Sequence, residues 1–164
     1  MPPKVMHGAR AKVGIVDPQT GIVNIIGIWN NFSYQLSYDV QPSFILGRFS
    51  AAELTTTGVE PVAITAQGWR VVDHGPFQDG RLTNLKDLLF QEYLVLTVYD
   101  RQVAAGQQPR AIATIRGCLP TGTSSTLSAK QLQESSNTYL GLLMDDESTI
   151  NAEDPSAADL PGLV

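Results

Sequence analysis

Few residues that can perform chemistry lie close together in this sequence, and the most suggestive group is Asp73 and His74 with Asp79. A carboxylate beside an imidazole is the arrangement that a general base requires. The Gly-Pro pair that follows His74, and the glycine after Asp79, also predict a loop in which the imidazole hydrogen-bonds to backbone atoms. We favour the loop, and a catalytic role for His74 would require loss of a measured activity on its mutation.

The single cysteine, Cys118, could act as a nucleophile only with a base beside it in the fold. Its position at the end of an apolar run, before Leu119 and Pro120, favours a packed structural thiol instead. One cysteine also excludes an internal disulfide, which indicates a reducing compartment. His7 and His74 are too far apart in the sequence to indicate a metal site.

Sequence motifs of the common enzyme classes are missing. The chain has no Gly-x-Ser-x-Gly nucleophile elbow, no glycine-rich phosphate loop ending in Lys-Ser or Lys-Thr, and no His-Glu-x-x-His zinc motif. We therefore predict that the protein is not an enzyme and uses no cofactor and no metal.

The composition predicts one folded domain, because 164 residues with 43% hydrophobic and 16% charged content can bury a core. The net charge of −5 is concentrated at one end, since six acidic residues and no basic ones follow Met144. Residues 1–144 carry 10 acidic against 11 basic residues, without the basic stripe that binds nucleic acid. No segment approaches the roughly 20 apolar residues of a membrane span, and residues 1–7 lack the apolar core of a secretion signal.

Alternating apolar and polar residues predict several β-strands. Residues 13–16 and 22–29 flank a turn that contains Pro and Gly, and they predict a hairpin. The clearest alternation lies in residues 32–40, which predict a strand with one aromatic and one polar face. Residues 62–72 predict a long strand with a bulge at Gly68.

The second half of the chain adds one helix and more strands. Residues 83–92 predict a short helix capped by Thr83. The apolar residues 93–99 predict a central strand buried on both sides, and residues 111–117 predict its returning partner in a second hairpin. Residues 137–144 predict a final strand. These elements together predict a mainly β fold, a two-sheet β-sandwich or barrel with one short flanking α-helix.

A long connection at residues 41–60 interrupts this pattern, and such stretches are usually functional in compact domains. Three large apolar residues lie in it, Phe44, Ile45 and Leu46, and they are costly to leave in water. They either fold back onto the core or form a contact with another subunit. The same two interpretations apply to residues 51–54.

Five segments carry a resemblance to a known family: FSYQLSYDVQP at 32–42, LGRFS at 46–50, GWRVV at 68–72, LKDLL at 85–89 and TYLGL at 138–142. In their order along the chain and in their pattern of residue types, they resemble the tail tube proteins of tailed bacteriophages, which are virion structural proteins. The resemblance covers roughly residues 9–147. It implies a single β-rich tube-type domain at residues 1–147, followed by an acidic C-terminal tail at residues 148–164.

The resemblance implies a structural subunit. In this family a two-sheet β-barrel with one flanking helix assembles into hexameric rings, whose inner strands join into one continuous barrel. The rings stack into a hollow tube through which the genome passes, and contractile injection systems and type VI secretion share this architecture. A location in the virion tail, assembly in the host cytoplasm, and tail sheath or baseplate proteins as partners are also implied.

Two sets of residues acquire expected roles from the resemblance. The connection at residues 41–60 becomes a long assembly loop, an inter-subunit arm with six contact residues: Phe44, Ile45, Leu46, Arg48, Phe49 and Leu54. The polar face of residues 32–40 becomes lumen-facing: Ser33, Gln35, Ser37 and Asp39. Such a lining lets double-stranded DNA pass without specific binding, because only Lys and Arg would hold its phosphates.

Two other functions fit the same sequence. A tail terminator or baseplate protein of similar fold would form one ring and stop. A monomeric ligand-binding β-sandwich module would instead gather its aromatic residues on an exposed face, and its solution mass would be that of one chain.

Overall fold

The protein is mainly β, as the sequence predicts. The computed structural model describes residues 11–16, 23–25, 29–69, 81–82, 85–90, 92–100 and 110–146. Within them lie ten strands and one 3-10 helix: β1 (Ala11–Val16), β2 (Val23–Ile25), β3 (Trp29–Gln35), β4 (Tyr38–Ser43), β5 (Glu53–Val59), β6 (Val62–Trp69), η2 (Leu85–Phe90), β7 (Leu94–Asp100), β8 (Arg110–Thr126), β9 (Glu134–Gly141) and β10 (Leu143–Asp146). No helix among these residues is long and apolar enough to cross a membrane.

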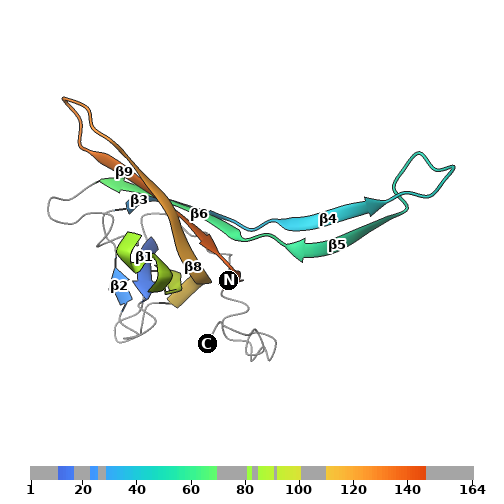
Figure 1. Cartoon of the computed structure of the whole chain (residues 1–164), viewed down its shortest axis with the longest axis horizontal. Helices are drawn as coiled ribbons and strands as arrows, with labels where there is room; N and C mark the ends of the chain where they lie inside the picture. The colour runs from blue at the N-terminus through green and yellow to red at the C-terminus, as the bar shows by residue number, and fades with distance from the viewer. Residues whose placement is uncertain are drawn as a thin grey trace, which may run out of the picture.

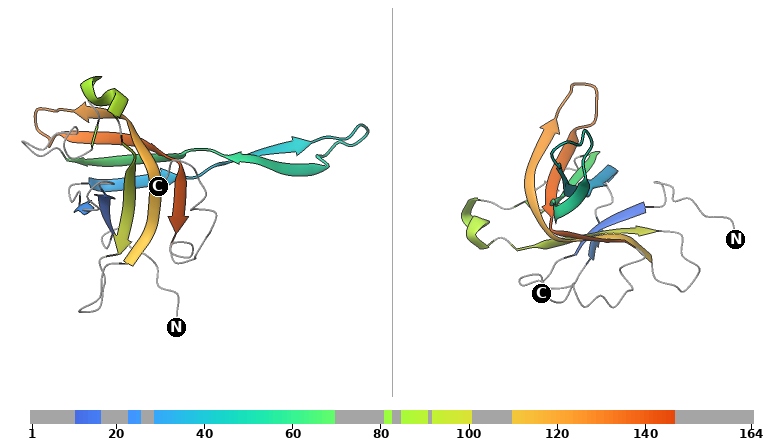
Figure 2. Two further views of the ribbon diagram at one scale, coloured as in Figure 1. Left: turned by 60° about the horizontal axis from the view of Figure 1, so that its bottom comes forward. Right: turned by 90° about the vertical axis from the view of Figure 1, so that its right-hand side faces the viewer.

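Eight strands form one continuous sheet in the order β2-β1-β7-β8-β9-β6-β3, with β10 also paired to β8. The first half of β8 pairs with β7 and its second half pairs with β9. Gly117 lies where β8 passes from one half to the other, and its φ of 65° is one that glycine adopts most readily. The sheet curls there into half a barrel, as the right-hand view of Figure 2 shows.

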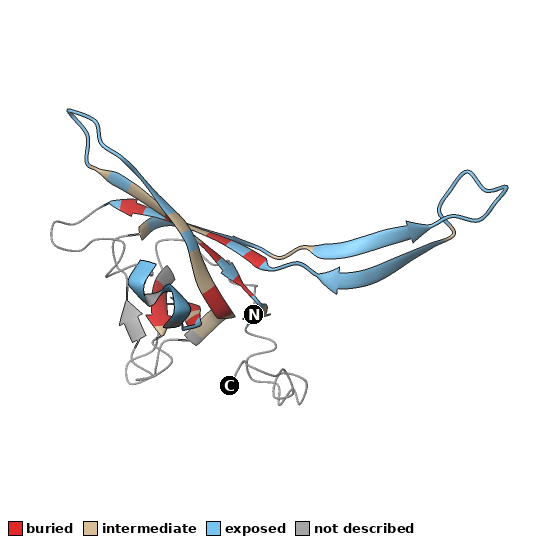
Figure 3. Ribbon diagram, viewed as in Figure 1, coloured by how far each residue is buried: buried red, intermediate tan, exposed pale blue. Residues whose placement is uncertain are grey.

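The hydrophobic core is formed by buried residues of β1, β6, β7, β8 and β9; buried residues are red in Figure 3. In β6 buried residues alternate with more exposed ones, because successive side chains of a strand point to opposite faces. Ile64 from β6 packs in one cluster with Leu96, Ile115 and Tyr139, each at most 2% exposed. The strand predicted at residues 93–99 is confirmed as the buried strand β7.

Both predicted hairpins are present, since β1 pairs antiparallel with β2, and β7 pairs antiparallel with β8. The strand predicted at residues 137–144 is divided at Leu142 into β9 and β10, and β10 returns to the first half of β8. Several sequence expectations fall outside the described residues: the turn at residues 17–21, the N-terminal segment with His7, the group of Asp73, His74 and Asp79, the cap Thr83, and the acidic tail at residues 148–164.

The connection at residues 41–60 is more ordered than the sequence predicts. β4 and β5 pair antiparallel from Tyr38 and Val59 at the base to Ser43 and Glu53 at the far end. They form a separate two-stranded sheet that projects from the body, called the arm here and defined as residues 38–59 (Figure 1). The β-branched residues of β5 favour this extended conformation.

The strand predicted at residues 32–40 is two strands in two different sheets. β3 pairs with β6, whereas β4 pairs with β5, and the chain passes between them at Leu36 and Ser37. Opposite this break Pro61 has no N–H to donate to the ladder. The Glu60 N–H donates to the Ser37 carbonyl oxygen at 2.9 Å. The arm therefore joins the body where the ladder of backbone hydrogen bonds is interrupted.

Two smaller expectations are corrected. The helix expected at residues 83–92 is the six-residue η2, a 3-10 helix and not an α-helix, because that tighter geometry is common in such short pieces. The bulge expected at Gly68 lies on the partner strand, where the register of β3 against β6 shifts between Trp29 and Asn31. The extra residue at that irregularity is Asn30.

Candidate assembly surfaces

The part of the sheet made by β8, β9, β6 and β3 has one polar face. Residues that pair across neighbouring strands share a face, and three rows of pairs lie away from the core: Asn31, Gln67, Ser136 and Ser124; Ser33, Thr65, Thr138 and Gly122; Gln35, Ala63, Leu140 and Leu119. In the intervening rows, Ile64, Ala66, Asn137 and Tyr139 of the two central strands are buried. The three rows contain hydroxyl, amide and aliphatic groups and no Lys or Arg.

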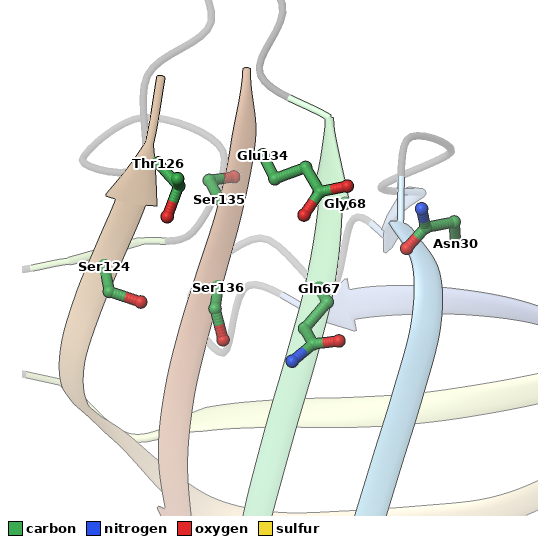
Figure 4. A pocket seen from close by; sticks show the side chains of 8 residues that line it. All are labelled: Asn30, Gln67, Gly68, Ser124, Thr126, Glu134, Ser135 and Ser136. Carbon is green, nitrogen blue, oxygen red and sulfur yellow. The ribbon is translucent and has the colours of Figure 1, made fainter. Parts of the chain in front are cut away.

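A hollow of about 320 Å³ opens at the end of this part of the sheet that is farther from the arm (Figure 4). Glu134 is the one charged residue among those that line it: Asn30, Gln67, Gly68, Ser124, Thr126, Glu134, Ser135 and Ser136. Beside it the Asn31 Nδ2–H donates to Gln67 Oε1 at 3.3 Å. Neutral amides and hydroxyls bind water and offer no charge to hold a phosphate.

The structure separates the four residues that the sequence assigns to a lumen. Ser33 and Gln35 lie on the polar face of β3. Ser37 lies in the break between β3 and β4, and Asp39 lies on the arm. There the Thr57 Oγ1–H donates to Asp39 Oδ2 at 2.6 Å.

Most polar residues of this face were not singled out by sequence reasoning. They are Asn31, Thr65, Gln67, Ser124, Ser136 and Thr138. The alternation of β6 was a usable signal for Thr65 and Gln67, because it predicts their side opposite the buried residues. The Ser/Thr-rich run of β8 and β9 lacks apolar alternation, so its facing could be assigned only from the register with β6.

Both edges of the four-stranded part are open within the described residues. β3 pairs on one side with β6, and residues 119–126 of β8 pair on one side with β9. Unpaired N–H and C=O groups at such an edge can pair with a strand of another chain. The sheet can therefore be extended at either side by further copies.

The arm is amphipathic because of its register. On one face lie Tyr38, Val40, Pro42, Leu54, Thr56 and Val59, which are mostly apolar, and on the other lie Asp39, Gln41, Ser43, Glu53 and Thr55. Every residue of β4 and β5 is exposed. A two-stranded hairpin is marginally stable alone in water, so an exposed apolar face on it indicates a contact surface.

The loop at the end of the arm is also apolar. The exposed fractions are 68% for Phe44, 58% for Ile45 and at least 100% for Leu46 and Phe49. Gly47 adopts a φ of 90°, and the Arg48 N–H donates to the Ile45 carbonyl oxygen at 3.1 Å, which closes the turn. These side chains do not fold back onto the core of their own chain.

Cys118 is placed as a structural residue. It is 0% exposed, and its Sγ–H donates to the Ile115 carbonyl oxygen at 3.3 Å. Burial raises the pKa of the Cys118 thiol to about 12, so the thiolate that a nucleophile needs does not form near neutral pH. Among the described residues no three His, Cys, Asp or Glu side chains gather as they would around a metal ion.

The stability of the fold should fall in alkaline solution. Burial raises the pKa of Cys118 from 9.0 to about 12 and also raises the pKa of Tyr139. The unfolded chain loses protons that the folded chain keeps above about pH 9 for Cys118 and above about pH 10 for Tyr139. The free energy of unfolding should therefore fall by up to about 1.4 kcal/mol per pH unit for each group above its own threshold. Below pH 9 these two groups should have no such effect.

Urea unfolding at about pH 8 and about pH 10.5 measures this slope. A Cys118→Ala variant should lose the part of the slope that belongs to the thiol. An equal free energy of unfolding at the two pH values would contradict the assignment of Cys118 as a buried neutral thiol.

Solved structures with a similar fold belong to tubes. The chain aligns with the SPP1 tail tube at a TM-score of 0.62 and 9% identity, covering 85% of this chain and 77% of that one. It aligns with the sheath/tube terminator of PVC, an extracellular contractile injection system, at a TM-score of 0.61 and 15% identity, covering 88% and 99% of the two chains. It aligns with the tail of an empty GTA particle with C6 symmetry at a TM-score of 0.61 and 10% identity, covering 87% of this chain and 98% of that one.

The chain has a β-rich fold of the tube type. More particularly, the chain has the fold of the tail tube proteins of phages and of contractile injection systems. No protein-family model matches the sequence, and no curated protein sequence matches it. At 9% to 15% identity the likeness establishes the fold alone.

Proposed function

We propose that this protein is the structural subunit of a phage-type tail tube. Six copies form a ring in which the four-stranded parts join edge to edge into one continuous barrel. Rings then stack into a hollow tube that conducts the genome. The observation that carries this proposal is the polar face of β8, β9, β6 and β3, because it is free of basic residues and lies between two open edges.

The polar face suits the wall of a conduit for DNA. If it lines the lumen, Ser33 and Gln35 lie there together with the hydroxyl and amide groups of β6, β8 and β9. Ser37 and Asp39 follow toward the base of the arm. Double-stranded DNA passes such a wall without specific binding, since no Lys or Arg in the three rows can neutralise its phosphates.

The arm suits the contact between rings. Its apolar end reaches beyond the body (Figure 1), and its six contact residues are Phe44, Ile45, Leu46, Arg48, Phe49 and Leu54. Burial of these side chains against the next ring would remove the exposed apolar surface that the isolated chain presents.

Similar solved structures come from a PVC sheath-tube complex and from an AFP baseplate. Tail sheath or baseplate proteins are accordingly the heterologous partners in this proposal. The assembled protein is located in the virion tail, and its assembly takes place in the host cytoplasm.

A terminator ring is the second candidate function. It is favoured by the PVC sheath/tube terminator, whose TM-score of 0.61 is close to the 0.62 of the SPP1 tail tube. A terminator forms one ring and stops, so the two functions differ in the size of the assembly that the purified chain can reach.

The mass of the purified assembly, measured by light scattering, tests the proposal. A tube subunit should give broad masses that are multiples of six 17.7 kDa chains, whereas a terminator should stop at a single ring. A stable species of one chain at high concentration, unchanged by addition of a preformed tube end, would contradict both functions.

Thiol labelling can test which face lines the lumen. In assembled tubes, a Ser33→Cys variant should react with a small maleimide but at least about tenfold more slowly with a large polymer-linked maleimide, because a thiol reacts only where the reagent has access. A Lys86→Cys variant on the exposed η2 is the matched control and should react with both. Equal rates of the large reagent at the two positions would place Ser33 outside the lumen.

A further inference from the structure

The arm joins the body across a gap in the pairing of the strands. The last pair of β3 with β6 on this side is Gln35 with Ala63, and the first pair of the arm is Tyr38 with Val59. Two residues lie between these pairs on one strand and three lie between them on the other. Because the numbers differ, the two ladders of backbone hydrogen bonds cannot continue into each other in register.

The body holds both strands up to the edge of this gap. Val62 is 0% exposed and pairs with β9, and Leu36 packs against the same core cluster as Val62. Between these two residues and the arm lie Ser37, Glu60 and Pro61, called the hinge residues here. Among them one backbone hydrogen bond crosses the gap, from the Glu60 N–H to the Ser37 carbonyl oxygen, and Pro61 has no N–H to donate another.

The arm is held together along its own length. Near its base the Thr57 Oγ1–H donates to Asp39 Oδ2 at 2.6 Å. At its far end the Ala52 N–H donates to the Ser43 carbonyl oxygen at 2.8 Å. The pairs of β4 with β5 lie between these two bonds. The arm can therefore move as one unit.

The arm has little contact with the body that would fix its orientation. All residues of β4 and β5 are exposed, and among the described residues neither core cluster includes one from the arm. The left-hand view of Figure 2 shows the arm projecting away from the body. Any movement between the two parts is thus concentrated at the hinge residues, because a hinge consists of a few residues between packed elements.

We propose that the hinge residues let the arm tilt as one rigid hairpin, so that the free chain holds the arm in a range of orientations and stacking on the next ring fixes one of them. Pro61 limits the range, since a residue before proline stays extended and Glu60 therefore cannot turn the arm back onto the body. The tilt is a property of the single chain, whereas its fixing rests on the proposed tube. Stacking is weakened by the fraction of free chains whose arm points in another direction.

Pulsed electron paramagnetic resonance measures the tilt as a spread of distances between two spin labels. Labels at Gln41→Cys on the arm and Gln67→Cys on β6 span the hinge. Labels at Gln35→Cys and Thr126→Cys, at opposite corners of the four-stranded part, are the matched control. In single chains, at a dilution where light scattering shows no assembly, the arm–body distribution should be at least about twice as wide as the control. The buried Cys118 does not take up the label.

The same labels test the role of the hinge in stacking. In tubes of labelled chains diluted among unlabelled ones, the arm–body distribution should narrow to the width of the control. Ser37→Gly with Glu60→Gly should widen it in single chains and raise the protein concentration needed for tubes at least about tenfold, because glycine adopts more backbone conformations. Ser128→Gly with Gln131→Gly, in the exposed loop between β8 and β9, should change neither.

The outcomes separate the hinge from the proposed function. An arm–body distribution as narrow as the control in single chains would overturn the hinge, whether or not tubes form. Equal widths in tubes and in single chains, or tubes at an unchanged concentration from the glycine variant of the hinge, would overturn its role in stacking. Absence of tubes from the unmodified chain would overturn the proposed function together with that role, and the distances in single chains would still decide the hinge.

Discussion

Replacement of Phe44, Ile45 and Leu46 together by serine is expected to leave a folded chain that forms no tubes. These side chains project from the end of the arm, 58% to 103% exposed, so their removal takes nothing from the core. If the next ring buries them, each contributes about 1.5–3 kcal/mol to the contact. Loss of all three should weaken stacking by at least about a thousandfold.

Sedimentation and electron microscopy measure the loss of tubes, and circular dichroism measures the fold. The matched control is the triple variant Gln41→Ala, Ser43→Ala and Thr55→Ala on the polar face of the arm, which should still assemble. Tubes from the serine variant at the normal protein concentration would show that the arm is not the contact between rings.

Substitution of Gly141 by alanine is expected to destabilise the fold by about 1–3 kcal/mol, the usual cost of an overpacked core. A Cβ atom at this position would collide with Cγ2 of Ile115 and would come within 3.2 Å of the Cys118 sulfur. Both neighbours are 0% exposed and have no free space to move into. Urea unfolding of the unmodified chain and of the Gly141→Ala variant measures the difference in their free energies of unfolding.

Gly58→Ala is the control for the same chemical change. A Cβ at Gly58 would meet no atom within 4 Å, so alanine there should be neutral or stabilising by up to about 1 kcal/mol. Equal stabilities of the Gly141→Ala and Gly58→Ala variants would mean that β9 does not pack on β8 as described.

The parts of the fold that local pattern determines were predictable from the sequence. The continuous apolar sequence of β7 predicts a strand that is buried on both sides. The sequences of β1 and β2 flank a turn that contains Pro and Gly. The mainly β class and the single short helical segment follow in the same way. Each of these depends on residues that are close together in the chain.

The arm was not predictable as a hairpin, because nothing within it signals pairing across nine loop residues. Pro42 and Gly58 are unfavourable in strands. Leu36 continues the apolar alternation of β3 into β4. The alternation of apolar and polar residues therefore does not indicate the break between the two sheets. That break depends on Pro61, which lies opposite in the folded chain.

The candidate surfaces were predictable in part. The sequence left open whether Phe44, Ile45 and Leu46 fold back onto the core, and the structure shows that they are exposed. The part of the polar face on β3 and β6 could be read from alternation within each strand, whereas the positions of Ser124 and Ser136 beside Gln67 depend on pairing between distant strands.

Electron microscopy of the purified, negatively stained chain tests the central claim most directly. The account predicts hollow tubes or stacked six-membered rings, because it assigns the open sheet edges and the apolar arm to contacts with further copies. Single chains that neither form rings nor extend a preformed tube end, even at high concentration, would contradict it.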